Sequence, residues 1–223
     1  MTQTTQLRFG NPPVRKVRLT FFFEADTVRV SDVISLLERW RSEFPIVEES
    51  APLPPLSSKD EFIPIGDSNW PLPFMTLADS DGLRTLLFQG DRFGVEWNFD
   101  ETSGADYPGF DDLRQSLEAK YSELVAQLAQ ANSRIVTTGV EVQYRNLLPG
   151  LTTNDYVVGL LSNWSVSDAE LSGEPDESTV YSRHFHPDMP GDAATWVSAR
   201  SDDEGSCELV FTVRTMDIPE NSH

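Results

Sequence analysis

The sequence predicts an α+β fold: a largely antiparallel sheet with two helices packed on one face, followed by a strand-rich acidic C-terminal part. Two segments, 31–44 and 110–132, carry apolar residues at helical spacing, and most other segments show the period of two typical of strands. The order is strand, helix, three strands, helix, strand and further strands. This order does not alternate as a doubly wound parallel sheet requires.

The first strand and helix are the clearest elements. Residues 17–25 read VRLTFFFEA, which predicts a core strand with one apolar face. That face comprises Val17, Leu19, Phe21 and Phe23. Ser31 follows as the expected N-cap of a helix that Pro45 ends.

Residues 45–73 contain seven prolines and no sustained periodicity. We expect a long irregular loop that packs back on the body through Phe62 and Trp70, because loops of this length inside a domain are usually functional or disordered. A linker between two domains is the alternative interpretation.

Three strands are expected next, at 74–78, 83–89 and 93–99, joined into an antiparallel meander by turns rich in Asp and Gly. The second helix then opens after Gly109 and stops near Asn132. Its apolar stripe comprises Phe110, Leu113, Leu117, Tyr121, Leu124 and Leu128.

A long strand is expected at 135–148, with a bulge or bend at Gly139. Four shorter strands follow, at 166–171, 179–185, 195–199 and 208–215. Residues 1–150 therefore form a body of strand, helix, three strands, helix and strand. Residues 151–223 form a strand-rich acidic extension that we expect to pack on the same body.

Charge is distributed unevenly along the chain, whose formal net charge is -19. Residues 151–223 carry fourteen Asp and Glu against Arg183, Arg200 and Arg214, whereas residues 1–41 carry seven Lys and Arg against four acids. Anionic lipid and phosphate backbones would repel such a chain, and no stretch is apolar enough to span a membrane. We therefore expect a basic protein partner, and neither nucleic acid nor membrane as a direct partner.

The N-terminal residues and the cysteine content indicate a cytoplasmic protein. The segment MTQTTQLRFG lacks the apolar core of a signal peptide, and Cys207 has no second cysteine to pair with. Because Cys207 stands among Leu209, Val210 and Phe211, we expect its thiol to be buried and unreactive.

Four motifs occur in a fixed order: FPIVEE at the end of the first helix, the hairpin DGLRTLLFQGDRFGVEW, the helix start YPGFDDL and the strand VEVQYRN. With these motifs, residues 14–148 resemble a sporadically distributed family of bacterial proteins. The resemblance implies the fold and a bacterial origin. It carries no catalytic residue over to this chain.

A metal site is a weak possibility at His184, His186 and Asp188. Residues two apart on a strand point to the same side, and two imidazoles with a carboxylate can hold zinc. The spacing alone does not supply the further ligands that a zinc site needs, and an ordinary polar edge strand explains these residues better. No metal and no cofactor are therefore predicted.

Other candidate residues suggest binding and not catalysis. Tyr144 and Asn146 should share one side of a strand, as a ligand site or as a structural polar anchor. The acidic run Asp202, Asp203 and Glu204 is a candidate contact for a basic partner. The sequence contains no nucleophile elbow, phosphate-binding loop or dinucleotide fingerprint, so no catalytic residue is assigned.

The leading hypothesis is a non-enzymatic bacterial interaction protein whose acidic surface binds a basic protein, for example as an antitoxin, immunity or defence-system component. The alternative is a small-molecule-binding protein or enzyme with a cleft between the sheet, the helices and the 45–73 loop. A third interpretation is adaptation to a salty cytosol, in which the acidity only keeps the protein soluble.

Overall fold

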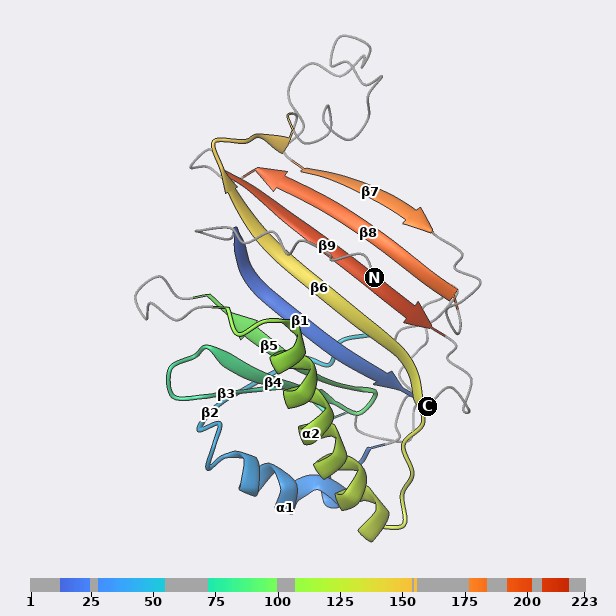
Figure 1. Ribbon diagram of the computed structural model, residues 1–223. Coiled ribbons are helices and arrows are strands. Elements are labelled where there is room, and N and C mark those ends of the chain that lie inside the picture. The colour runs from blue at the N-terminus through green and yellow to red at the C-terminus, as the bar shows by residue number, and fades with distance from the viewer. Residues whose placement is uncertain are drawn as a thin grey trace, which may run out of the picture.

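Strands whose apolar residues alternate assemble into one antiparallel sheet, and both amphipathic helices pack on one side of it (Figure 1). The computed structural model describes residues 13–24, 28–54, 72–99, 107–153, 155, 177–183, 192–201 and 206–216, with the backbone alone for 177–183, 192, 201 and 216. Within these residues the sheet has nine strands in the order β2-β3-β4-β5-β1-β6-β9-β8-β7. The predicted α+β class is confirmed.

The elements have the following bounds: β1 Val14–Phe23, α1 Val30–Trp40, β2 Ile46–Ser50, β3 Phe74–Ala78, β4 Arg84–Gln89, β5 Arg92–Asn98, α2 Phe110–Gln130, β6 Thr137–Pro149, β7 Glu177–Arg183, β8 Asp192–Ser201 and β9 Ser206–Met216.

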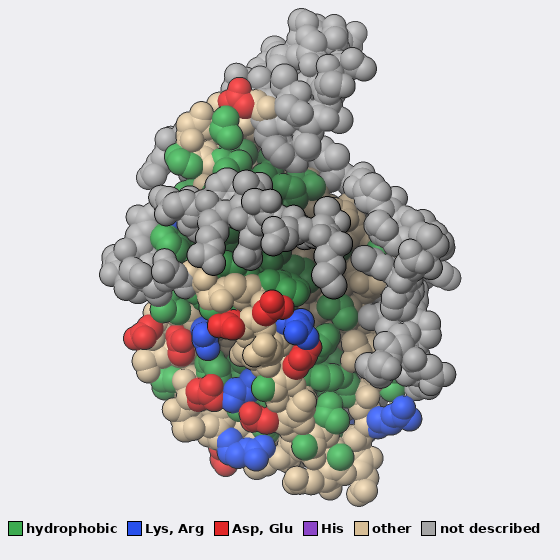
Figure 2. Space-filling model, in the orientation of Figure 1, with side chains coloured by type: hydrophobic (Ala, Val, Ile, Leu, Met, Phe, Trp, Pro, Cys, Tyr) green, Lys and Arg blue, Asp and Glu red, His purple; other side chains and the backbone are tan. Residues whose placement is uncertain are grey.

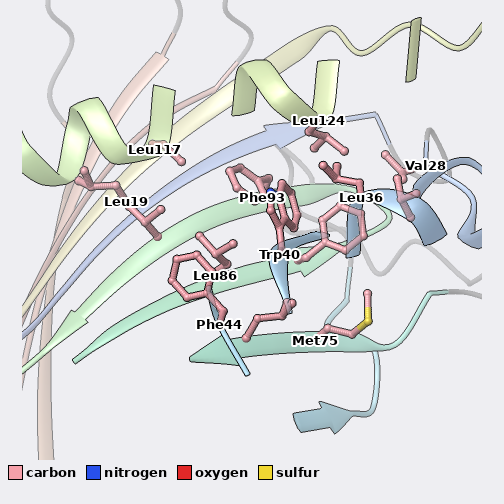
Figure 3. Close-up of a cluster of buried hydrophobic side chains, with 14 of the residues drawn as sticks. Leu19, Val28, Leu36, Trp40, Phe44, Met75, Leu86, Phe93, Leu117 and Leu124 are labelled. Carbon is pink, nitrogen blue, oxygen red and sulfur yellow. The ribbon is translucent and has the colours of Figure 1, made fainter. Parts of the chain in front are cut away.

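The core lies between the helices and the strands β1, β3, β4 and β5. Every second residue of β1 points toward the helices, and Val17 and Leu19 there are buried, as the sequence predicts. Trp40 of α1 stacks on Phe93 of β5, with ring centroids 5.5 Å apart. Figure 3 shows Leu117 and Leu124 of α2 closing this cluster from above. The helices therefore cover the N-terminal half of the sheet.

Local chemistry fixes the meander β3-β4-β5, which has the predicted antiparallel pairing. The Asp79 Oδ1 atom accepts a hydrogen bond of 2.9 Å from the Leu83 backbone N–H, and Gly82 adopts a φ of 70° in the same turn. A short polar side chain and a glycine satisfy the two demands of a tight turn.

Both helix starts differ in detail from the prediction. Arg29, and not Ser31, occupies the N-cap of α1, and no side chain caps that end. Ser31 lies inside the first turn, where its hydroxyl donates to Asp32 Oδ1. In α2, Phe110 is exposed and does not belong to the buried stripe, because it stands at the first helical position, next to Gly109.

The expectation of an irregular segment at 45–73 is wrong at its beginning. Residues Ile46–Ser50 form β2, which pairs with β3 at one edge of the sheet. The next residues are held by side chains, because the Gln89 amide bonds both backbone groups of Leu53 and the Arg92 guanidinium donates to the Pro54 carbonyl. Phe62 and Trp70 lie outside the described residues.

Beyond α2, β6 runs beside β1, and the register between them shifts next to Gly139, where a bulge or bend was expected. The strands β9, β8 and β7 extend the sheet past β6. They correspond to three of the four predicted C-terminal strands, with the fourth, at 166–171, outside the described part of the chain.

Candidate interaction surfaces

The side of the sheet that faces away from the helices carries a buried carboxylate, Glu96 of β5. Its side chain accepts hydrogen bonds from Lys16 Nζ at 2.7 Å and Arg18 Nε at 2.8 Å, both on the neighbouring strand β1. Only 5% of Glu96 is exposed. Burial alone raises the pKa of Glu96, but the charges and hydrogen bonds of Arg18 and Lys16 outweigh it, and the pKa is lowered below 4.5. Glu96 is therefore ionised at neutral pH and acts as a fixed negative charge within the sheet.

A second ion pair on the same side joins the C-terminal strands to the body. Glu141 of β6 is buried and accepts hydrogen bonds from both Nε and Nη2 of Arg214 on β9. The guanidinium also lies over the Trp196 ring of β8, 4.7 Å from its centroid. The charge of Arg214 is therefore paired with Glu141 of the body, so Arg214 contributes little to neutralising the acids of residues 151–223.

Two ionisable side chains of α2, Lys120 and Glu123, also have pKa values shifted in favour of their charged forms. The hydrogen bonds of Lys120 with Glu43 and Glu123 offset the effect of burial, and the pKa of Lys120 is raised. For Glu123, burial is the largest single cause and acts to raise the pKa. Hydrogen bonds from Trp40 and Lys120 outweigh it, so the pKa of Glu123 is lowered. The raised pKa of Lys120 and the lowered pKa of Glu123 both favour the charged forms, which suits a link between helices and not proton transfer.

Two tyrosines on the helix side stay protonated. Burial first, and then the neighbouring Tyr144 hydroxyl, raise the pKa of Tyr107. The two hydroxyls do not meet the geometry of a hydrogen bond, so Tyr107 Oη is buried without a partner. Burial also raises the pKa of Tyr121, although its hydroxyl shares a hydrogen bond with Thr137. Neither phenol is suited to act as a base near neutral pH.

The predicted pair Tyr144 and Asn146 lies on the helix-facing side of β6, since Tyr144 pairs with Val17 of β1 and Asn146 follows two residues later. Asn146 is buried, and its Nδ2 donates to the Leu209 carbonyl of β9 at 3.4 Å. This bond is what the structural-anchor interpretation requires. A ligand role for the pair stays a prediction.

The remaining candidates lie outside the described residues. They are the possible metal ligands His184, His186 and Asp188 and the acidic run Asp202, Asp203 and Glu204. In the sequence the acidic run falls between β8 and β9, which pair with each other. Among the residues that the structure describes, no three His, Cys, Asp or Glu side chains gather in a way that could hold a metal ion.

The sequence analysis missed a further surface on the helix-facing side of β6, β8 and β9. We call it the uncharged face, because none of its described residues carries a charge. By the register of the three strands it comprises Val140, Val142, Tyr144, Asn146, Leu148, Ala193, Thr195, Val197, Ala199, Cys207, Leu209, Phe211, Val213 and Thr215.

Parts of the uncharged face are buried and parts are open. Cys207 is buried as predicted, in a small cluster with Ala199 and Leu209. Phe211 is 38% exposed and Val213 is 43% exposed, although β9 lies in the interior of the sheet. Val142 and Tyr144 of the face pack against the core under the helices. The alternation of residues 206–216 predicts the apolar face, but it does not predict the exposure of Phe211 and Val213.

In comparisons with known proteins, no family model, no curated protein and no solved structure matches the chain. In the described part of the chain, neither helix is long and apolar enough to cross a membrane.

Proposed function

We propose that this chain is a non-enzymatic interaction protein that binds a basic protein through its acidic C-terminal part. The observation that carries the proposal is the charge of residues 151–223, where fourteen acids stand against three arginines. A basic surface is the natural complement of such a region, because opposite potentials attract and like charges exclude other partners.

The ion pairs strengthen this charge imbalance. Arg214 is engaged by Glu141, which belongs to the body. Glu208 Oε1 of β9 is 3.5 Å from Arg145 Nε of β6, and both side chains are partly exposed, so this pair is weak. Few cations therefore remain to neutralise the acids of the C-terminal part.

The pKa directions agree with binding better than with catalysis. A general acid or base works best with a pKa near the operating pH. The described groups with a shifted pKa move the other way: the carboxyl pKa values of Glu96, Glu123 and Asp155 are lowered, and those of Lys120, Tyr107 and Tyr121 are raised. These groups act as fixed charges or neutral hydroxyls.

One form of the proposal is an antitoxin, immunity or defence-system component of the bacterial cytoplasm. In that form, carboxylates take the place of phosphates on the surface of a nucleic-acid-binding toxin. The distribution of the acids and the resemblance of residues 14–148 to a sporadic bacterial family support it.

The experiment is an association-rate measurement with a partner captured by the full chain at low salt and then purified. We expect a basic partner whose association rate constant approaches about 10⁸ M⁻¹s⁻¹ at low salt. The rate should fall as the screening length shortens to about 8 Å at physiological ionic strength. No captured partner, or a rate independent of salt, would contradict the proposal.

A matched pair of variants locates the surface. The double variant Asp202→Asn, Asp203→Asn should slow association several-fold at low salt and change dissociation little. The control Glu48→Gln, Glu49→Gln neutralises two exposed acids on β2, at the opposite end of the sheet from β7. Equal slowing by both variants would mean that net charge alone, and not the acidic C-terminal part, drives the encounter.

A further inference from the structure

The turn between β4 and β5 holds three polar side chains away from water. Figure 2 shows lysine, arginine and acidic side chains on the surface over the helices, where water solvates them. Gln89, Asp91 and Arg92 are instead only 6%, 6% and 8% exposed. Polar groups at this depth need hydrogen-bond partners, so what they bind indicates what the turn does.

These three side chains orient one another. The Asp91 carboxylate accepts hydrogen bonds from Arg92, from Nε at 2.9 Å and from Nη2 at 2.8 Å, and from Gln89 Nε2 at 3.0 Å. The Arg92 guanidinium also lies over the Phe22 ring, 5.5 Å from its centroid. A bidentate pair of this kind fixes the plane of the guanidinium. The remaining donors and acceptors of Gln89 and Arg92 therefore have fixed directions.

The backbone of the turn is anchored to the core. The Asp91 carbonyl accepts a hydrogen bond of 2.9 Å from the Phe23 N–H, and the Gly90 carbonyl accepts one of 3.4 Å from the Val28 N–H. Phe23 and Val28 are both buried in the main hydrophobic cluster. The turn is therefore a preorganised part of the body, and it does not need to rearrange in order to bind.

The turn binds the main chain of residues 51–54, which we call the strap. Gln89 Oε1 accepts a hydrogen bond of 2.8 Å from the Leu53 N–H, and Gln89 Nε2 donates one of 2.9 Å to the Leu53 carbonyl. Arg92 Nη2 donates to the Pro54 carbonyl at 2.6 Å. Leu53 and Pro54 make no backbone–backbone hydrogen bond with another residue that the structure describes. Side chains of the turn therefore supply the polar contacts of the strap.

The sequence of the strap suits this mode of binding. Each of its two prolines, Pro52 and Pro54, fixes its own φ and keeps the preceding residue out of the helical region. The strap is therefore extended before it binds and loses little conformational entropy. The Leu53 side chain is 37% exposed, so the turn recognises the main chain of this residue more than its side chain.

We propose that Gln89, Asp91 and Arg92 form a binding site for the main chain of an extended, proline-containing segment, and that the strap is its displaceable ligand. Three hydrogen bonds hold the strap, and no ladder of backbone bonds has to break when it leaves. The strap therefore opens without unfolding of the sheet, and a peptide of the same class takes its place. This site binds neutral main-chain groups, so it does not depend on the proposed function.

A proline substitution in the full chain tests main-chain recognition. Leu53→Pro replaces the Leu53 N–H with a ring carbon that lies against Gln89 Oε1, so the strap should open. Leu53→Ala is the matched control, because it shortens the side chain and keeps the main-chain groups. Nuclear magnetic resonance follows the exchange of the Gln89 side-chain amide protons with water. This exchange should be about tenfold faster or more in Leu53→Pro and nearly unchanged in Leu53→Ala. Equal rates in the two variants would overturn the proposal.

A probe peptide tests whether the site accepts a ligand from another molecule. The probe is Ser-Ala-Pro-Leu-Pro, which is the sequence of residues 50–54, capped at both ends. At millimolar concentration it should shift the Gln89 and Arg92 side-chain signals of Leu53→Pro in a saturable way. Leu53→Ala should show no such shift, because its attached strap has an effective concentration of millimolar order. No saturable shift in Leu53→Pro, or the same shift with Ser-Ala-Pro-Pro-Pro, would also overturn the proposal.

A second variant covers the case in which circular dichroism shows that Leu53→Pro does not fold. Gln89→Met removes both amide contacts from the side of the turn, and the Leu53 N–H should then exchange about tenfold faster or more. Gln143→Met is its control, because the Gln143 amide donates to Thr212 of β9 and not to the strap. The same Leu53 exchange rate in both methionine variants would contradict the site.

Discussion

The helix-facing side of the sheet has two halves with the same residue pattern and different surroundings. In β1, β4 and β5 the alternate apolar residues are buried under α1 and α2, and Phe93 has no exposed surface. In β6, β8 and β9 the alternation continues without a charged residue, yet Phe211 remains 38% exposed. A period of two thus determines which side of a strand is apolar, but it does not determine what covers that side.

On the side of the sheet that faces away from the helices, the two halves also differ in how deeply their charged side chains are buried. Glu96, in the N-terminal half, is buried between two cations, whereas the side chain of Glu208, in the C-terminal half, is 37% exposed beside one arginine. Stability should therefore depend mainly on the N-terminal half, and the acidic surface that we propose for a partner belongs to the C-terminal half.

The largest expected effect compares one phenylalanine from each half. Phe93→Ala should lower the free energy of unfolding by about 3–5 kcal/mol, because it removes a ring from the closed cluster with Trp40. Phe211→Ala should cost less than about 1 kcal/mol, since its ring is only partly buried. Urea denaturation of both variants makes the comparison. Equal losses would show that the two halves are packed alike.

A smaller effect compares the two carboxylates. Glu96→Gln removes the charge that Lys16 and Arg18 share and should cost about 2 kcal/mol. Glu208→Gln should change the free energy of unfolding by less than about 0.5 kcal/mol, because its pair with Arg145 is exposed. Chemical denaturation at neutral pH measures both. A larger loss for Glu208→Gln would reverse the assignment of stability to the N-terminal half.

The pH dependence of this difference should be the smallest signal. The folded pKa of Glu96 is lowered from 4.5, so its stabilisation is fully present above pH 4.5 and is lost as the pH falls through the folded pKa. The free-energy gap between the unsubstituted protein and Glu96→Gln should stay constant from pH 7 to about pH 5 and then shrink. Denaturation of both proteins across this range isolates Glu96 from other carboxylates. A gap that widens toward acid would contradict the lowered pKa.

The residues that local rules govern could be predicted. Strand β3 has the predicted bounds, β4 begins one residue later than predicted, β5 begins and ends one residue earlier, and Gly139 marks the irregularity in β6. Each depends on an alternation or a turn residue that acts within a few positions of the chain. Residues 46–50 were missed because the prolines around them hide a short edge strand, whose partner β3 lies more than twenty positions away.

Surface properties were harder to predict than elements. The position of Asn146 followed from alternation, but its bond to Leu209 depends on the pairing of β6 with β9 across sixty-three positions. The uncharged face could be found only after three strands were placed side by side. The acidic run at 202–204 stays a prediction, because it lies outside the described residues.

Because the helices cover one half of the sheet and leave Phe211 and Val213 of the other half partly exposed, the backbone amides of the two halves should differ in hydrogen exchange. Native-state hydrogen exchange of the full chain measures this difference most directly. The amides of β4 and β5 should exchange only through global unfolding, whereas those of β8 should exchange through local opening at a lower free energy. Equal opening free energies in the two halves would contradict this division of stability.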